Sequence, residues 1–215
     1  MDAQELLEKY TAGDRDFSRL LLQGIVLPAV DLSEVNLFEA DLTLANLEQT
    51  NLQGAELSLA NLSRASLKQT NLFRVNLNGA SLYKAFLFGA NLSEAYLIDA
   101  DLSDANLEEA ILQGAFLTSA NLTKANLSRA NLSRASLTGV SLNNANLAGA
   151  DLTETDLTRA NLTGANLTDA DLTGANLTGA KLNWANLSNA KFIGVNLKGV
   201  YFGTPGGSED SILIG

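Results

Sequence analysis

Leucine recurs at every fifth position from Leu22 to Leu187, and large apolar residues extend this register to Phe17 and Phe202. The register comprises 38 consecutive pentads without an insertion. With the leucine position called i, position i−2 is mostly Ala, i−1 is mostly Asn or Asp, and i+1 is often Ser or Thr. The pentad 160–164, Ala-Asn-Leu-Thr-Gly, is typical.

The five-residue period excludes the regular secondary structures. Successive leucines would drift by roughly 140° around an α-helix and form no apolar face. In a flat strand the side-chain period is two, so every other leucine would point outward. Asn, Asp, Ser, Thr and Gly supply turns and side-chain-to-backbone hydrogen bonds. The pattern therefore predicts a backbone that turns once per pentad and points i and i−2 inward, which is a solenoid of short strands.

The repeated Ala-(Asn/Asp)-Leu motif resembles that of the pentapeptide-repeat protein family over residues 15–203. The resemblance implies an all-β solenoid, a right-handed quadrilateral β-helix with four pentads in each square coil. Thirty-eight pentads then make about nine and a half coils, with residues 20 apart stacked. We expect the Thr50 and Thr70 hydroxyls to point inward and to bond a backbone carbonyl or each other. A column of side-chain amides is expected at Asn126, Asn146, Asn166 and Asn186.

The ends of the solenoid need caps, because open ends aggregate. Residues 1–14 are predicted to form an N-terminal capping helix, in which Asp2 and Glu5 fit a capping box. We interpret the helix as a lid over the first coil; the alternative is a partner-binding helix. The stretch 5–17 is similar to the start of cyanobacterial pentapeptide-repeat proteins, including one that suppresses heterocyst formation.

The C-terminal tail, residues 204–215, carries the apolar tip Ile212-Leu213-Ile214 after a Gly- and Pro-containing break. Two interpretations remain open at this end. The tip folds back as a lid, or the last coil pairs with a second copy to form a homodimer.

Composition argues against an enzyme. The chain has no His and no Cys, so the usual general base and the thiolate nucleophile are absent. No phosphate-binding glycine loop or metal-ligand cluster is found, and Asp99, Asp101 and Asp104 lack the glycine and glutamate of a calcium loop. We expect no cofactor and no metal. No apolar run reaches membrane-spanning length and the start is acidic, so we expect a cytoplasmic protein without membrane contact.

Apolar side chains at outward positions are the strongest functional signal. Only 6% of the residues are aromatic, and most of these are not needed by a Leu/Ala interior. We expect Tyr96 to stack on Phe116, and Tyr83 to meet Phe86 around a corner. Exposed apolar clusters mark interaction sites, although the rings could also simply cover the wall. The candidate partner-binding residues are Phe73, Tyr83, Phe86, Phe88, Tyr96, Ile98, Ile111 and Phe116.

The net charge of −10 raises the alternative of DNA mimicry, which pentapeptide-repeat proteins that inhibit DNA gyrase use. The charges alternate along the chain, however. Residues 31–56 and 94–109 carry acids without bases, while residues 57–93 and 110–150 carry bases without acids. A duplex mimic needs one continuous negative field. The sequence therefore favours a non-enzymatic scaffold or regulator that docks a protein partner on its outer wall, without direct nucleic-acid binding. The alternative is a DNA-mimic inhibitor of DNA gyrase or of another DNA-binding protein.

Overall fold

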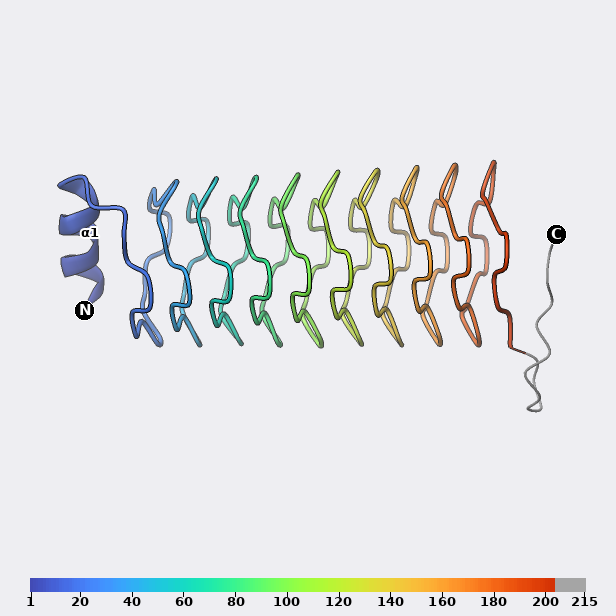
Figure 1. The fold of residues 1–215 in the computed structure, drawn as a ribbon, viewed down its shortest axis with the longest axis horizontal. Coiled ribbons are helices and arrows are strands. Elements are labelled where there is room, and N and C mark those ends of the chain that lie inside the picture. The colour runs from blue at the N-terminus through green and yellow to red at the C-terminus, as the bar shows by residue number, and fades with distance from the viewer. Residues whose placement is uncertain (204–215) are drawn as a thin grey trace.

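The computed structural model describes residues 1–203, which form a short helix at one end of a tower of square coils (Figure 1). Helix α1 spans Ala3–Thr11. The remaining described chain is held by parallel β-bridges that join each i−1 residue to the residue 20 positions later, from Asp16–Asn36 to Lys181–Tyr201. The predicted coil of four pentads is thus confirmed, with each strand reduced to a single bridge. The predicted tail with its Ile212–Ile214 tip lies outside the described residues.

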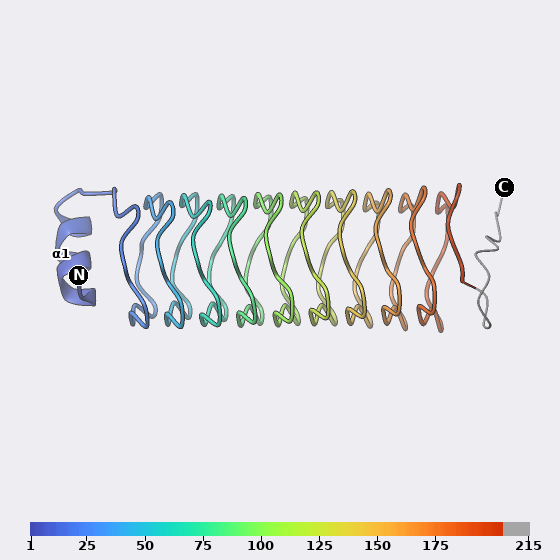
Figure 2. The same ribbon diagram turned by 60° about the horizontal axis from the view of Figure 1, so that its bottom comes forward.

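Each coil has four walls, and the corners of successive coils align along the tower (Figure 2). Wall 1 consists of residues 16–19 and all residues displaced from them by multiples of 20. Walls 2, 3 and 4 begin in the same way at residues 21–24, 26–29 and 31–34. Walls 1 and 3 are opposite sides of the square. A residue's number therefore fixes its wall and its height.

Leucine at i and alanine at i−2 fill the interior, as the period predicts. From Leu37 to Leu177 every leucine at i is at most 2% exposed. Burying one leucine side chain stabilises the fold by about 1.5–3 kcal/mol. The large and small side chains alternate along the chain, so they interdigitate in a narrow interior.

The five amide groups of a pentad each have a distinct acceptor. Three of them bond to carbonyls of adjacent coils, and the i−2 amide closes a turn onto the preceding leucine. The i+1 amide lacks a backbone acceptor, and in most pentads it donates to the side-chain oxygen at i−1. Buried backbone groups need partners, so this fifth bond explains the Asn or Asp at i−1. In the pentad 40–44 the bonds are Ala40 to Leu37, Asp41 to Leu20, Leu42 to Asn61, Thr43 to the Asp41 carboxylate, and Leu44 to Ser63.

The turn at each corner requires an unusual backbone conformation. Every residue at i+2 from Arg19 to Gly199 has a positive φ, and most of these residues are not glycine. A left-handed conformation costs about 1–2 kcal/mol for a residue with a side chain. The i+2 amide donates to the coil above in nearly all of these turns, so pairing between coils holds the strained residues in place.

The inward threonines behave as predicted. The Thr70 hydroxyl donates to the Leu47 carbonyl at 2.7 Å, and the Thr50 hydroxyl donates to the Leu27 carbonyl. Thr155, which is equally buried, bonds the Leu132 carbonyl at 2.9 Å. In each case the acceptor lies 23 residues earlier, in the coil below. Within residues 1–203 no buried side-chain nitrogen or oxygen lacks a partner.

The predicted amide column on wall 3 is largely confirmed. Asn146 donates to Asn126, and Asn166 donates to Asn146, each at 3.0 Å. The prediction was wrong for Asn186, whose amide donates instead to the Thr168 hydroxyl at 2.9 Å. A hydroxyl at i+1 of the coil below competes with the amide oxygen, and it prevails at this end of the tower.

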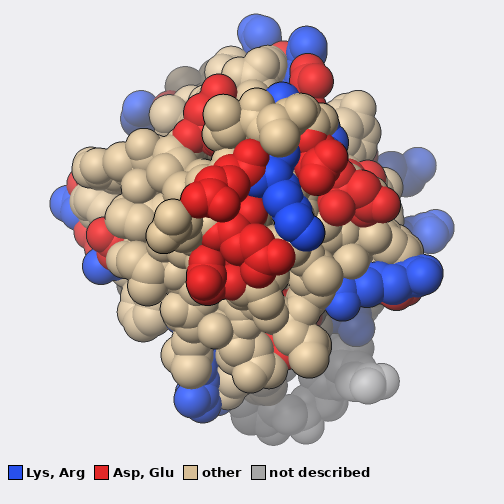
Figure 3. Space-filling model, turned by 90° about the vertical axis from the view of Figure 1, so that its left-hand side faces the viewer, with Lys and Arg blue, Asp and Glu red and all other residues tan. Residues whose placement is uncertain are grey.

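Helix α1 covers the first coil. The Asp2 side chain accepts the Glu5 amide and caps the helix, which is one half of the predicted capping box; the Glu5 carboxylate lies 3.6 Å from the Lys9 ammonium instead. Leu6 is buried in the core, and the Tyr10 hydroxyl donates to the Ser33 carbonyl at 2.9 Å. Acidic side chains gather over this end of the molecule (Figure 3). With nine residues, α1 is too short to cross a membrane, and no other helix occurs in the described part of the chain.

Thr50 and Thr70, which stack in adjacent coils, give a matched test of the hydroxyl bonds. Leu27 accepts only the Thr50 hydroxyl within residues 1–203, whereas Leu47 also accepts the Thr50 amide. Replacing Thr50→Val should therefore strand a buried carbonyl, which costs about 1–3 kcal/mol, while Thr70→Val should cost less. Native-state hydrogen exchange of the amides in the two adjoining coils measures this difference. Equal protection losses in both variants would contradict the assignment.

Asp171 should contribute stability that depends on pH. Hydrogen bonds from Thr173 and then from Lys191 lower the pKa of its carboxyl from 3.8 to about 2. Because the pKa is lower in the folded chain, the ionised group stabilises the fold above pH 4, and this contribution is lost as pH falls from about 4 towards 2. Asp171→Asn retains an acceptor for the Thr173 amide but loses the charge.

In urea unfolding, the wild type should therefore be more stable than the Asp171→Asn variant at neutral pH, and the two should converge near pH 2. A difference of constant size across this range would contradict the pKa assignment.

Candidate protein-docking surface

The eight candidate residues do not form one patch. Their numbers place them on all four walls, as a belt around the middle of the tower. Only wall 1 collects three of them. Tyr96, Ile98 and Phe116 lie on wall 1, Tyr83 on wall 2, Phe86 and Phe88 on wall 3, and Phe73 and Ile111 on wall 4.

The three residues of wall 1 form a continuous apolar surface, here called the ring strip. As predicted, Tyr96 and Phe116 stack, with ring centroids 5.2 Å apart and planes inclined by 9°. Tyr96, Phe116 and Ile98 are 43%, 42% and 38% exposed, so the strip presents the outer faces of its side chains to solvent. Lower on the same wall lie Leu59, which is 54% exposed, and Phe38.

The rings of the strip occupy positions that the fold would fill with Asn or Asp. Tyr96 and Phe116 are i−1 residues, so neither can accept the amide at i+1. The Ile98 amide is satisfied by the Asn78 side chain from the coil below, at 2.8 Å. The Thr118 amide has no protein acceptor within residues 1–203. Phe116 thus leaves one amide of the wall without a protein acceptor in the described part of the chain, as Phe86 and Ile111 do for the amides of Phe88 and Gln113.

The other candidate residues are more isolated. Phe86 interrupts the amide positions of wall 3, and Ile111 interrupts those of wall 4. Phe73 and Tyr83 are partly buried and lie beside cations of their own chain. The Arg74 guanidinium is 4.8 Å from the Phe73 ring centroid, and the Lys84 ammonium is 5.1 Å from that of Tyr83. The expected contact between Tyr83 and Phe86 stays a prediction.

The acidic and basic stretches of the sequence form ion pairs that run along the tower axis between neighbouring coils, here called vertical ion pairs. Cations and anions about 20 residues apart stack on one wall and join neighbouring coils. Such exposed pairs contribute about 0–1 kcal/mol each, and they interrupt any continuous negative stripe. The pairs are Arg19–Glu39, Lys68–Glu48, Arg74–Glu94, Arg129 with Glu108 and Glu109, Arg134–Glu154 and Lys191–Asp171.

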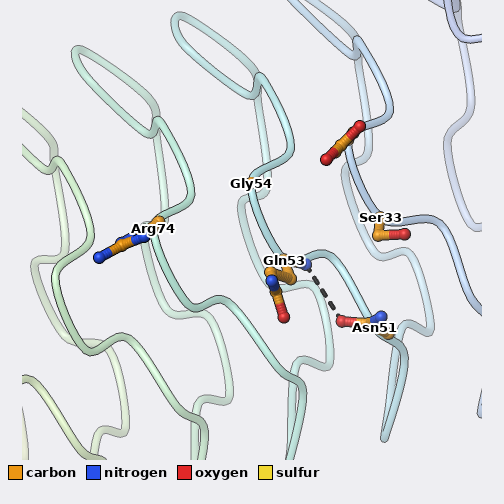
Figure 4. Close-up of a pocket in the computed structure, with 6 residues that line it drawn as sticks. Ser33, Asn51, Gln53, Gly54 and Arg74 are labelled. Carbon is orange, nitrogen blue, oxygen red and sulfur yellow. Dashed lines mark hydrogen bonds between the residues drawn. The ribbon is translucent and has the colours of Figure 1, made fainter.

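A shallow groove lies on wall 4 (Figure 4). Its volume is about 460 Å³, and Arg74, Gln53 and Asn51 contribute polar groups to its lining. The Asn51 oxygen already accepts the Gln53 amide, and Arg74 is paired with Glu94. The groove holds no nucleophile with an adjacent base. Within residues 1–203 no group of three or more Asp or Glu side chains is arranged to hold a metal ion.

The repeated sequence was compared with models of known protein families. The model of the family described as pentapeptide repeats matches eight times between residues 16 and 203. The chain belongs to the pentapeptide-repeat family. As in other pentapeptide-repeat proteins, its coils form a right-handed quadrilateral β-helix.

Several solved structures are similar to this chain. HetL, a pentapeptide-repeat protein of the cyanobacterium Nostoc involved in regulating heterocyst differentiation, is 34% identical, with a TM-score of 0.54 over 98% of this chain and 100% of HetL. Rfr23 of Cyanothece is 28% identical over 55% of this chain and 91% of its own, with a TM-score of 0.44. QnrB1, a plasmid-mediated fluoroquinolone resistance protein, is 23% identical over 87% of each chain, with a TM-score of 0.37. A comparison with curated proteins finds no match.

Sequence reasoning assigned Tyr83 and Phe86 to neighbouring faces and stacked Tyr96 on Phe116, but it offered all eight candidates as one patch and did not note that they are spread over four walls. The signal was available, because the remainder of a residue number on division by 20 gives its wall. It also missed Gly79, whose small size makes room for Leu59. A β-carbon on Gly79 would lie 2.7 Å from Leu59 Cδ2.

Two glycines of wall 1 test whether Gly79 sets the position of Leu59. Gly79→Ala and Gly139→Ala place alanine at φ values of +66° and +67°, so each should cost about 1–2 kcal/mol. Only the Gly79 variant crowds Leu59, since nothing lies within 4 Å of the corresponding position at Gly139. The Leu59 methyl signals in ¹³C NMR should shift in Gly79→Ala alone. Unchanged signals in both variants would show that Leu59 does not rest on Gly79.

Proposed function

We propose that this pentapeptide-repeat protein is a non-enzymatic regulator that docks a protein partner on the ring strip of wall 1. The observation that carries the proposal is the stacked, half-exposed pair Tyr96–Phe116 at two positions where the fold favours Asn or Asp. Large exposed apolar side chains that cluster are characteristic of interaction sites, and aromatic residues dominate binding energy at such sites. The full-length similarity to HetL, a protein involved in regulating differentiation, supports a regulatory role.

A rigid wall suits this kind of binding. The strip is held by bridges to the coils above and below, so docking requires little ordering of the surface itself. No inserted loop protrudes beside the strip on wall 1, because no insertion interrupts the pentads around it. The binding energy would then come from covering Tyr96, Ile98 and Phe116.

DNA mimicry is the weaker alternative. The vertical ion pairs place a cation beside an anion on three of the four walls, and wall 2 carries more bases than acids. Such walls would repel parts of a site built to neutralise evenly spaced phosphates. Protein docking at the ring strip needs no continuous negative field.

The triple variant Tyr96→Asn, Ile98→Thr, Phe116→Asn tests the proposal, because it restores the consensus of the fold while removing the strip. It should lose a partner that the wild type captures from cells of the source organism. Its melting temperature should be unchanged or higher, since the Thr118 amide regains an acceptor. Mass spectrometry of the captured proteins and thermal unfolding provide the two measurements.

The matched control is Phe86→Asn with Phe88→Thr, which removes two rings from the opposite wall. This control should retain the partner. If the triple variant keeps the partner and melts at a lower temperature, the rings stabilise the wall rather than bind a partner, and the proposal fails.

A further inference from the structure

The ring strip is bordered by an unpaired carboxylate. Asp99 directly follows Ile98, is exposed, and takes part in no ion pair within residues 1–203. Two arginines of the neighbouring coils are engaged elsewhere, and Lys84 and Lys124 on wall 2 form no ion pair with Asp99. Arg74 pairs with Glu94, and Arg129 pairs with Glu108 and Glu109. A partner that covered the strip would therefore also cover a free negative charge.

Elsewhere the protein combines such a carboxylate with an arginine and a ring. The Arg19 Nε donates to Glu39 Oε2 at 2.8 Å, and its guanidinium carbon is 5.6 Å from the Phe38 ring centroid. Arg19 is at i+2, its acid lies 20 residues later, and the ring precedes that acid.

A second set on wall 4 has the same arginine and glutamate, but its ring, Phe73, directly precedes the arginine rather than the acid. The Arg74 Nε donates to Glu94 Oε2 at 2.7 Å, and the guanidinium carbon is 4.8 Å from the Phe73 centroid. Again the arginine is at i+2 and the glutamate lies 20 residues later. Arginine suits both contacts, because its planar group bonds carboxylates and also stacks on ring faces.

At the ring strip the carboxylate and the rings are present without an arginine. The residue 20 positions before Asp99 is Gly79, at the i+2 position that Arg19 and Arg74 occupy in the complete sets. No cation lies over the Tyr96 or Phe116 ring within the described residues. A β-carbon on Gly79 would meet only the end of the flexible Leu59 side chain, which reaches up from the coil below.

We propose that the partner supplies this arginine, from a protein segment in which an arginine stands beside an apolar side chain. The inference rests on the proposed function of the ring strip. The guanidinium would bond Asp99 above Gly79, and the apolar side chain would cover Ile98 and Phe116. Covering Asp99 without a cation would leave a desolvated charge unpaired, which opposes binding by acidic or purely apolar segments. The same charge repels nucleic-acid phosphates.

Selection from a display library of short random peptides tests the chemistry without knowledge of the partner. Peptides are selected on the wild type and counter-selected on the triple variant that lacks the strip. We expect the enriched peptides to share an arginine next to an apolar residue. Fluorescence anisotropy of one labelled enriched peptide then gives dissociation constants.

Three variants make the binding measurement specific. Asp99→Asn, which tolerates the positive φ of +57° at this position, should weaken the peptide roughly tenfold or more. Gly79→Arg should weaken it comparably by placing an arginine beside Asp99 within the chain. Gly24→Arg, which adds the same residue at a φ of +66° on wall 2, is the control and should bind as the wild type does. Replacing the peptide's arginine by lysine should also weaken binding.

The possible failures are distinguishable. Enriched peptides without a cation, or binding unaffected by Asp99→Asn, overturn the arginine proposal while docking at the strip stands. A library that yields nothing selective for the strip overturns both proposals. Sedimentation equilibrium provides a further check, since a dimer that dissociates on Asp99→Asn would show that a second copy of the chain covers the strip.

Discussion

The fifth amide of each pentad is the constraint on which this structure depends. Four amides find backbone acceptors in the turn or in adjacent coils, whereas the i+1 amide in most pentads is bonded by a side-chain oxygen at i−1. This requirement explains the Asn and Asp of the motif, and it makes the rings of the strip informative. Tyr96 and Phe116 occupy a position where the backbone needs an acceptor and they provide none. Functional sites commonly contain residues that do not suit the local requirements of the fold.

The fold could be predicted almost completely from the sequence, because the period of five indicates the inward positions and the resemblance to pentapeptide-repeat proteins implies the four-pentad coil that assigns each residue to a wall. Thr50 and Thr70 were placed correctly since a buried hydroxyl has few acceptors in a solenoid. Asn186 was not, because its amide could choose between an amide oxygen and the Thr168 hydroxyl. A sequence pattern gives positions, whereas competition between two nearby acceptors is decided by local geometry.

The candidate site was only partly predictable. The stack of Tyr96 on Phe116 followed from their spacing of 20. The separation of Phe86 and Ile111 onto other walls followed from the same arithmetic, which had not been applied to the whole set. The place for an arginine beside Asp99 needed side-chain geometry, because only Arg19 and Arg74 show how an arginine at i+2 contacts a carboxylate and a ring.

The contact between helix α1 and the first coil has a consequence for how the chain finds its register. In the stretch 121–180 neighbouring pentads are nearly identical, so a coil could in principle omit one pentad and still bury its leucines. Such a slip would move Arg134 away from Glu154 and opposite either Gly149 or Arg159. The Tyr10 hydroxyl on Ser33 specifies which pentads form the first coil. Helix α1 thus fixes the register of the first coil. The non-consensus residues along the walls, such as Arg134 and Glu154, favour the same register in the later coils.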